Sequence, residues 1–478
     1  MRKTIITIQF AVLSLGFTAC SLAPDYERPA EALPTTMGEA TTASTVNDIA
    51  LDKWWERFND PVVNSLVERA LENNTDVLSS AASLRAARAA LGMANADKWP
   101  ALSGSGSAAR KETPHYQLTP GADDTGNAFA LSAMLNYELD LFGRVASSSD
   151  AAREDLASTA YAMQSVRSTI AAETVSTYYN LVAAREQLAI TMESVETRRN
   201  TLKIQEERYD AGYGSDAERQ QSQAELANAE VTIPDLKQNI ESLQSALRIL
   251  TGASAEEIWN AEPLAAVPQA LPEPPAVGLD YLPASLLERR PDVLAAEAQL
   301  KAANARIGVA KAQRWPTISL GGIIGTGDSD IDDLFTSPAR TWTLSGAISG
   351  PIYDFGKSKG RIESAEAAAE IAELNYIAVV RSAFKELRDA ATKSEYSRQS
   401  VEARIKQAAS WDRYLEIATE RYKSGYADPL ELLDAERGQL SARLQLVNAR
   451  LDRLVSAVNL CKALGGGWEA QSDVVSKR

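Results

Sequence analysis

The stretch from Arg144 to Ala211 contains neither glycine nor proline, the residues that most often end a helix. At about 1.5 Å per residue, an unbroken α-helix of this length extends roughly 100 Å, far beyond an ordinary globular helix. Apolar residues with heptad spacing, typical of coiled coils, recur along it. They are Leu156, Met163 and Ile170, and then Leu181, Leu188, Val195, Leu202 and Tyr209. The sequence therefore predicts a long helix over 144–211 that packs beside other helices.

The same pattern occurs a second time along the chain. Residues 76–100 and 292–316 align without a gap, and both blocks end in Trp-Pro. Residues 142–213 and 355–426 also align, with Phe-Gly before each long stretch and Arg-Tyr-x-x-Gly after it. Chance similarity between alanine-rich helices is the alternative, and these shared landmarks argue against it. The sequence predicts an internal duplication, with a second long helix over 357–424.

Between the short and the long helix of each half, apolar and polar residues alternate. Every second residue of 129–141 is apolar, and Trp342, Leu344 and Ile348 follow the same rule in the second half. This period of two is typical of β-strands with one apolar face. The sequence predicts a β-hairpin at about 101–142 and another at about 317–355. Their loops carry Asp123 and Asp124, and then Asp328, Asp330, Asp332 and Asp333.

Strands of this length fit a membrane barrel, in which a strand needs only about 9–11 residues. Strands of an ordinary sandwich are the alternative. Four strands cannot close a membrane barrel, because the smallest use about eight. Open sheet edges are not tolerated in lipid. We therefore expect the barrel to be shared between several chains.

A shorter helix returns after each long one, at 216–250 and 429–464, and ends near Leu250 and Leu464. The predicted organisation is a signal peptide at 1–19, a lipidated tether at 20–53, a first repeat at 54–252, a proline-rich linker at 253–283, a second repeat at 284–464 and a tail at 465–478. The predicted fold class is mainly α with membrane β, in which a coiled-coil tunnel continues into a transmembrane β-barrel.

Composition excludes several function classes. The formal net charge of −15 argues against nucleic acid as a partner. His115 is the single histidine, so paired imidazole ligands and histidine-based catalysis are excluded, and we expect no metal site. Cys461 continues a heptad row with Leu433, Leu440, Val447 and Leu454, which predicts a buried core thiol rather than a disulfide. No phosphate-binding loop is present. We expect neither enzyme activity nor a bound cofactor.

The N-terminus has the features of a targeting segment. Basic Arg2-Lys3 precedes an apolar run that ends in Thr18-Ala19-Cys20. Small residues before a cysteine resemble a bacterial lipoprotein signal, which implies cleavage before Cys20 and a covalent lipid on its thiol. Ser21 after the cysteine resembles the outer-membrane sorting rule. An ordinary secretory signal is the alternative.

Taken together, these landmarks resemble the outer membrane factor family, the TolC-like exit ducts of tripartite efflux pumps, in its NodT/OprM-like lipoprotein branch. The likeness covers nearly the whole mature chain. The stretches that carry it are Cys20 to Pro29, Trp54-Trp55, Leu139 to Arg144, Leu287 to Asp292, Gly350 to Gly356 and Leu464 to Trp468.

The resemblance implies a homotrimer in the outer membrane of a Gram-negative bacterium, extending into the periplasm. The implied partners are outer-membrane lipid, a periplasmic adaptor (membrane fusion) protein and an inner-membrane pump of the resistance-nodulation-division class. The implied function is a passive, gated exit duct for small molecules. A protein-export duct of a type I secretion system and a structural lipoprotein that spaces the envelope layers are the alternatives.

The resemblance also assigns roles to residues at the ends of the long helices. The periplasmic tip turns fall on Arg208, Tyr209, Gly212, Arg421, Tyr422 and Gly425. The periplasmic gate falls on Leu430, Glu431 and Asp434, where three copies of Asp434 would form a carboxylate ring able to hold cations or repel anions. The alternative is that Asp434 is a solvated surface acid. Some relatives have a latch arginine two residues after the tip glycine, where this chain has Ala427 and Gly214. We therefore expect any latch to use other residues, with Arg208, Arg421 and Lys423 as the candidates.

Overall fold

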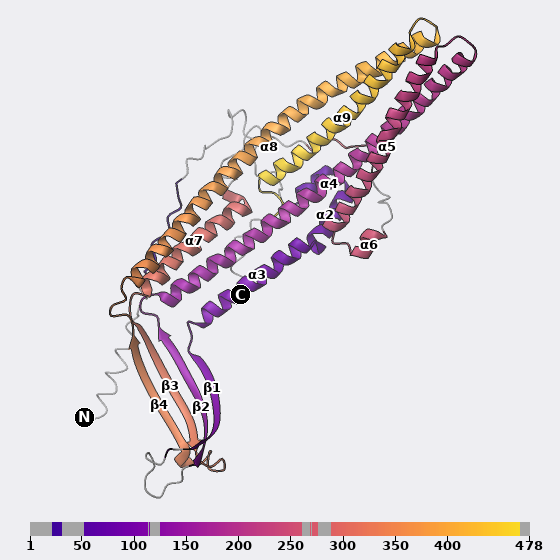
Figure 1. Ribbon diagram of the computed structural model, residues 1–478. Coiled ribbons are helices and arrows are strands. Elements are labelled where there is room, and N and C mark those ends of the chain that lie inside the picture. The colour runs from indigo at the N-terminus through magenta and orange to yellow at the C-terminus, as the bar shows by residue number, and fades with distance from the viewer. Residues whose placement is uncertain are drawn as a thin grey trace. The chain divides into compact units, whose positions relative to one another are not determined.

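The computed structural model describes residues 22–30, 52–112, 114, 125–260, 268, 270–275 and 288–468 (Figure 1). The predicted lipidation site Cys20, the signal peptide, His115, Asp123 and Asp124 lie outside these residues. The chain forms two compact units, which are treated separately. Unit 1 comprises Met1–Ala30, Leu84–Thr159 and Ala295–Ile377, and unit 2 comprises Glu31–Ser83, Ala160–Leu294 and Ala378–Arg478.

The order of elements repeats between the two halves of the chain, as the duplication predicts. The first half contains η3 (Trp54–Phe58), α2 (Pro61–Asn73), α3 (Thr75–Ala96), β1 (Ala101–Glu112), β2 (Thr125–Leu139), α4 (Arg144–Asp210), α5 (Asp216–Leu250) and α6 (Ala255–Trp259). The second contains α7 (Pro291–Ala312), β3 (Thr317–Asp328), η6 (Ser337–Ala339), β4 (Arg340–Ser349), α8 (Lys357–Lys423) and α9 (Pro429–Ala463). In this part of the chain, no helix has an apolar run that could cross a membrane.

The long helices α4 and α8 each contain 67 residues and stop one residue before their predicted ends. An aspartate stabilises each start by accepting a hydrogen bond from a backbone N–H of the first turn. Asp140 accepts from Ala146 at 2.7 Å, and Asp354 accepts from Ser358 at 2.7 Å. The helix starts are therefore fixed locally, directly after the strands.

The four strands form one antiparallel sheet in the order β1-β2-β3-β4, which belongs to unit 1 (Figure 1). The register places Leu135 beside Leu102 on β1 and opposite Gly322 on β3. Directly opposite residues share a face, so the predicted alternation gives one apolar face across all four strands. That face carries Leu102, Phe129, Leu131, Leu135, Tyr137, Ile318, Leu320, Ile324, Trp342, Leu344 and Ile348. The opposite face carries mainly Ser, Thr, Ala and Gly.

Among the described residues, no layer covers the apolar face of the sheet. Trp342 and Leu344 are each 79% exposed, and Leu102 is 75% exposed. A soluble sheet would bury such a face against a core. This exposure fits strands whose apolar side faces lipid.

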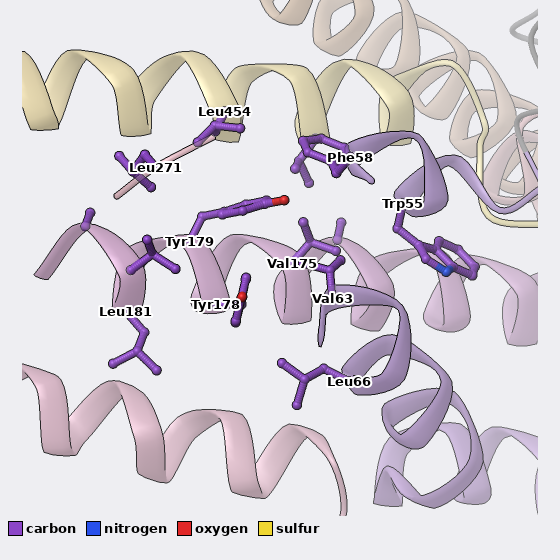
Figure 2. Close-up of a cluster of buried hydrophobic side chains, with 14 of the residues drawn as sticks. Trp55, Phe58, Val63, Leu66, Val175, Tyr178, Tyr179, Leu181, Leu271 and Leu454 are labelled. Atoms are coloured by element: carbon purple, nitrogen blue, oxygen red, sulfur yellow. The ribbon is translucent and has the colours of Figure 1, made fainter. Parts of the chain in front are cut away.

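The main apolar core lies in unit 2, where α4, α9, α2 and η3 meet (Figure 2). Phe58 and Tyr179 pack ring to ring at 5.6 Å, and the Tyr178 hydroxyl donates to Asp60 at 3.0 Å. Leu271 from the linker packs into the same core. Cys461 also lies there, 2% exposed, and burial raises the pKa of its thiol to about 11. The prediction of a buried core thiol is confirmed.

The N-terminal strap, residues 22–30, runs extended along α7 in unit 1. Its Arg28 guanidinium donates to the Glu297 carboxylate at 2.7 Å, and the Tyr26 hydroxyl donates to the same group at 3.3 Å. Asn304 donates its side-chain amide to the carbonyl of Pro24 at 2.7 Å. A Cβ at Gly308 would lie 2.8 Å from the Cβ of Ala23, so the close approach requires glycine. This part of the predicted tether is therefore docked.

We expect Glu297→Gln to release the strap. Burial alone would raise the pKa of Glu297, but hydrogen bonds from Arg28 and Lys301 outweigh it and hold the pKa below its usual value. The stabilisation is therefore present above the usual pKa of about 4.3 and is lost as pH falls through the lower folded value. At pH 7 the variant should show about tenfold faster hydrogen exchange in 22–30.

The matched control is Glu363→Gln, an exposed acid of α8 that pairs only with Lys359 at 3.4 Å in the described chain. It should leave exchange of the strap unchanged. Equal protection of the strap in Glu297→Gln and wild type would contradict the assignment.

Candidate functional site

The two long helices end in the same hydrogen-bonded turn, and both turns belong to unit 2 (Figure 1). The N–H of Gly212 donates to the carbonyl of Tyr209 at 3.0 Å, and that of Tyr213 donates to Arg208 at 2.8 Å. Gly425 and Tyr426 repeat both bonds at the same distances. This Schellman arrangement needs a left-handed residue, and the glycines supply φ values of +76° and +75°. The Arg-Tyr-x-x-Gly motif is therefore a helix stop.

Each return helix begins with a side-chain cap close behind the turn. Ser215 and Glu218 form a reciprocal capping box at the start of α5. At the start of α9, Asp428 accepts from the N–H of Leu430 at 2.9 Å, and Pro429 occupies the first turn. The two hairpins are thus rigid on both sides of their turns.

Tyr422 joins the first-repeat hairpin to the second-repeat hairpin. Its buried hydroxyl accepts from the Gln205 amide at 2.6 Å and from the Arg208 guanidinium at 3.0 Å. The guanidinium of Arg208 also lies 5.6 Å from the centre of the Tyr422 ring. The equivalent Tyr209 instead lies exposed beneath Arg219, at 4.7 Å. The predicted heptad row of α4 therefore leaves the interior at Tyr209.

The three predicted gate residues have different environments at the start of α9. The Glu431 carboxylate pairs with Arg421 of the preceding turn at 3.2 Å. Leu430 is 52% exposed, and Asp434 is exposed one helical turn further along the same face. Within the described chain Asp434 has no hydrogen bond or ion pair. Of the three predicted gate residues, Glu431 is thus paired within the chain, and Leu430 and Asp434 are exposed.

A layer of buried polar side chains behind the turns was not predicted. Thr191, Arg198 and Gln205 of α4 are each at most 4% exposed. Arg198 donates to the backbone carbonyl of Glu225 in α5 at 2.8 Å. These three residues have heptad spacing, so a polar row with coiled-coil periodicity was the available signal.

The same layer links α4 to α9. The Thr201 hydroxyl donates to the Glu436 carboxylate at 2.8 Å, and Glu436 is 3% exposed. Burial raises the pKa of Glu436, although the bond from Thr201 and the charge of Arg198 oppose that shift. Arg437 of α9 lies 3.5 Å from Glu225 of α5. Polar contacts therefore connect the two hairpins at several levels behind the turns.

The described chain contains no cluster of three or more His, Cys, Asp or Glu side chains placed to hold a metal ion. The turns offer exposed carboxylates, amides and guanidinium groups. These groups suit electrostatic contact and hydrogen bonding.

Comparison with known proteins gives consistent results. The family described as "Outer membrane efflux protein" matches residues 66–253 and 282–466. The chain is 33% identical to the solvent efflux pump outer membrane protein SrpC of Pseudomonas putida, over 97% of this chain and 98% of SrpC. It is 30% identical to the outer membrane protein OprJ of Pseudomonas aeruginosa, over 100% of this chain and 99% of OprJ.

Solved structures agree. The Campylobacter jejuni CmeC outer membrane channel superposes with a TM-score of 0.87 at 27% identity, over 96% of this chain and 97% of that chain.

We expect Tyr422→Phe to loosen the contact between the hairpins. Removing the hydroxyl leaves the buried Gln205 amide without its acceptor, which costs about 1–3 kcal/mol. Hydrogen exchange at 200–213 and 418–428 should become faster. Tyr209→Phe is the matched control, because it keeps the exposed ring beneath Arg219 and should have no effect. Equal exchange in the two variants would refute the role of Tyr422.

Proposed function

We propose that copies of this chain, which belongs to the outer membrane efflux protein family, form a passive exit duct. The chain is the outer-membrane channel component of an efflux system, and the proposed duct is gated at the two helix turns. The exposed apolar face of the β1–β4 sheet carries this proposal. Four strands with one apolar and one small, polar face become a lipid-facing wall with a wet interior only when several copies close the sheet. Three copies form the barrel and, with α4, α5, α8 and α9, a helical tunnel in the periplasm.

The duct supplies a path rather than energy. Energy comes from an inner-membrane pump of the resistance-nodulation-division class, joined to the duct by a periplasmic adaptor protein. The sequence has no nucleotide-binding loop that could power transport. Choice of cargo therefore belongs to the pump, and the duct passes small molecules that the pump delivers.

Leu430 and Asp434 are the proposed gate. Both lie exposed on one face at the start of α9, just behind the second turn. Around a threefold axis they give an apolar ring and a ring of three carboxylates, which concentrates cations at the narrowest point. Glu431 has a different task, because its pair with Arg421 holds the turn against α9.

The contact of Tyr422 with Gln205 and Arg208 is the proposed latch. It joins α8 to α4 close to the turns, in a chain that has Ala427 and Gly214 where some relatives have a latch arginine. Opening requires the second hairpin to move away from the first, which breaks these bonds. The latch therefore biases the duct towards the closed state.

Cys20 is the proposed lipid attachment site. The strap binds Asn304 through Pro24 and Glu297 through Arg28, a few residues after Cys20 in the sequence. A lipid on Cys20 would hold unit 1 at the membrane in addition to the strands.

We expect the wild-type protein to form cation-selective channels in planar bilayers, and Asp434→Asn to weaken block by divalent cations. Loss of the carboxylate ring should raise the half-blocking Mg²⁺ concentration about tenfold, corresponding to about 1.4 kcal/mol. Asp452→Asn is the matched control, an exposed acid of the same helix away from the turn. If it changes block as much as Asp434→Asn does, the gate assignment is wrong. A wild-type protein that never conducts would favour an envelope spacer instead.

The lipid is tested by labelling cells with radioactive palmitate. Wild-type protein should carry the label, and Cys20→Ala should carry none, since Cys461 is buried and its thiol is protonated at neutral pH. Cys461→Ala is the control and should label normally. Persistent label on Cys20→Ala would place the lipid elsewhere.

A further inference from the structure

The short helices α3 and α7 are copies of one sequence block, yet α7 is buried along most of its length, whereas the buried residues of α3 are Val77 and Leu84. Ala302 is 0% exposed and Ala305 is 9% exposed, whereas their counterparts Ala86 and Ala89 are exposed. Related sequences with unequal burial indicate that α3 lacks neighbours that α7 has. One of these neighbours is the strap, which contacts α7 at Glu297, Asn304 and Gly308.

The neighbours of α7 identify what is missing. Towards its own repeat, Lys311 of α7 lies 3.8 Å from Glu366 of α8. Towards the preceding repeat, Arg306 of α7 pairs with Asp155 of α4 at 2.5 Å. A Cβ at Gly308 would also lie 2.7 Å from the Ser147 hydroxyl of α4. Thus α7 packs between the long helix of its own repeat and that of the repeat before it.

Helix α3 has the first of these contacts within the chain, through a hydrogen bond of 2.8 Å between Asn95 and Ser149 of α4. Residues 1–74 contain no counterpart of the long helices, and α8 is the long helix left without a following short helix, so the second contact would come from α8 of another copy. The duplication specifies which residues would meet. Arg306 and Asp155 correspond to Ala90 and Ala368, and Gly308 and Ser147 correspond to Gly92 and Gly360.

These four residues are suited to such a contact. Both members of the ion pair are replaced together by alanine, and both members of the close approach are glycine. All four are exposed, and a Cβ added at Gly92 or at Gly360 would meet nothing within 4 Å. Small residues of this kind allow two helices to approach closely.

A contact within the chain shows that the repeats do change in pairs. Arg198 of α4 contacts Glu225 of α5 in the first repeat. Their counterparts are Trp411 and Gly438, and the Trp411 ring occupies the space that a side chain at Gly438 would need. Equivalent positions of the two repeats therefore stay in contact even when both residues change. By the same rule, we expect Ala90 and Ala368 to meet, because their counterparts Arg306 and Asp155 do.

An open groove of about 860 Å³ in unit 1 lies where the contact is expected. It is lined along α8 by Lys357, Gly360, Arg361, Ser364, Ala365, Ala368 and Ala372, and it is closed on the other side by Asp155, Gln299, Ala303 and Arg306. Its α8 floor is therefore made mostly of small side chains.

We propose that α3 of one copy packs into this groove of the next, with Gly92 against Gly360 and Ala90 against Ala368. Charges support a second copy as the occupant. Arg85 and Arg88 of α3 are exposed, as are Glu370 and Glu373 of α8, and none of the four has an ion pair in the described chain. The two surfaces differ, so the contact is heterologous and closes into a ring. The proposal rests on the shared barrel of the proposed function and adds the register of its helices.

Cysteine cross-linking tests that register. Gly92→Cys with Gly360→Cys should give disulfide-linked dimers and trimers in oxidised outer membranes, which reducing agent dissolves. In the equivalent contact within the chain, a Cβ at Gly308 would lie 2.7 Å from the Ser147 hydroxyl, which is close enough for cysteines at the two positions to form a disulfide. The control is Gly92→Cys with Ala367→Cys, which is about 10 Å further along α8 and should link at least about tenfold less. Equal linking by both pairs, or none by the first, overturns the register.

A charge pair covers the case in which the cysteine variants do not accumulate. Ala90→Arg with Ala368→Asp recreates the Arg306–Asp155 pair between copies and should remain trimeric on native gels. Ala90→Asp with Ala368→Asp places like charges together and should dissociate. Equal behaviour of the two overturns the proposal. Wild-type conductance is measured in parallel, so a wrong register with intact channels is distinguishable from failure of the duct itself.

Discussion

The open edges of a four-stranded sheet are the constraint on which the rest of the chain depends. Among the described residues, β1 pairs with β2 alone and β4 with β3 alone, so each outer strand leaves a row of backbone groups without a strand partner there. In lipid these groups can be satisfied only by other strands. Closure of the barrel by further copies pairs the edge strands and places the exposed apolar face against lipid. The helices that follow each hairpin then have to meet their neighbours around the same axis.

The duplication places two similar hairpins and two similar long helices in one chain. Sequence differences between the two copies then give equivalent positions different contacts. Both long helices stop at the same glycine turn, but only Tyr422 enters the interior and only α9 begins with Leu430 and Asp434. The strap likewise binds Glu297 of the second copy, whose counterpart in the first copy is Ala81. Similar turns thus place different chemistry at equivalent points, which supports the proposal that one hairpin is the fixed partner and the other the gate.

Local rules account for what the sequence predicted well. The long helices were visible because nothing interrupts 144–211, and their ends were predicted to within one residue because glycine alone supplies the left-handed turn. The sheet followed from its period of two. Tertiary features were harder to predict. Docking of the strap depends on a carboxylate 269 residues from Arg28, and the polar row through Arg198 occupies positions that a search for apolar heptads discards. Gate roles came from family resemblance, and no local rule distinguishes Asp434 from a solvated acid.

The equal lengths of the paired helices limit how this chain can change. Helices α4 and α8 each have 67 residues, and α5 and α9 each have 35. An insertion in α4 alone would shift Gln205 and Arg208 away from Tyr422 and rotate every side chain beyond it. A duct of different reach therefore requires matched insertions of whole heptads in all four helices. A single recombination event between the repeats cannot supply four matched insertions. We therefore expect the length of such ducts to change only in steps of whole heptads.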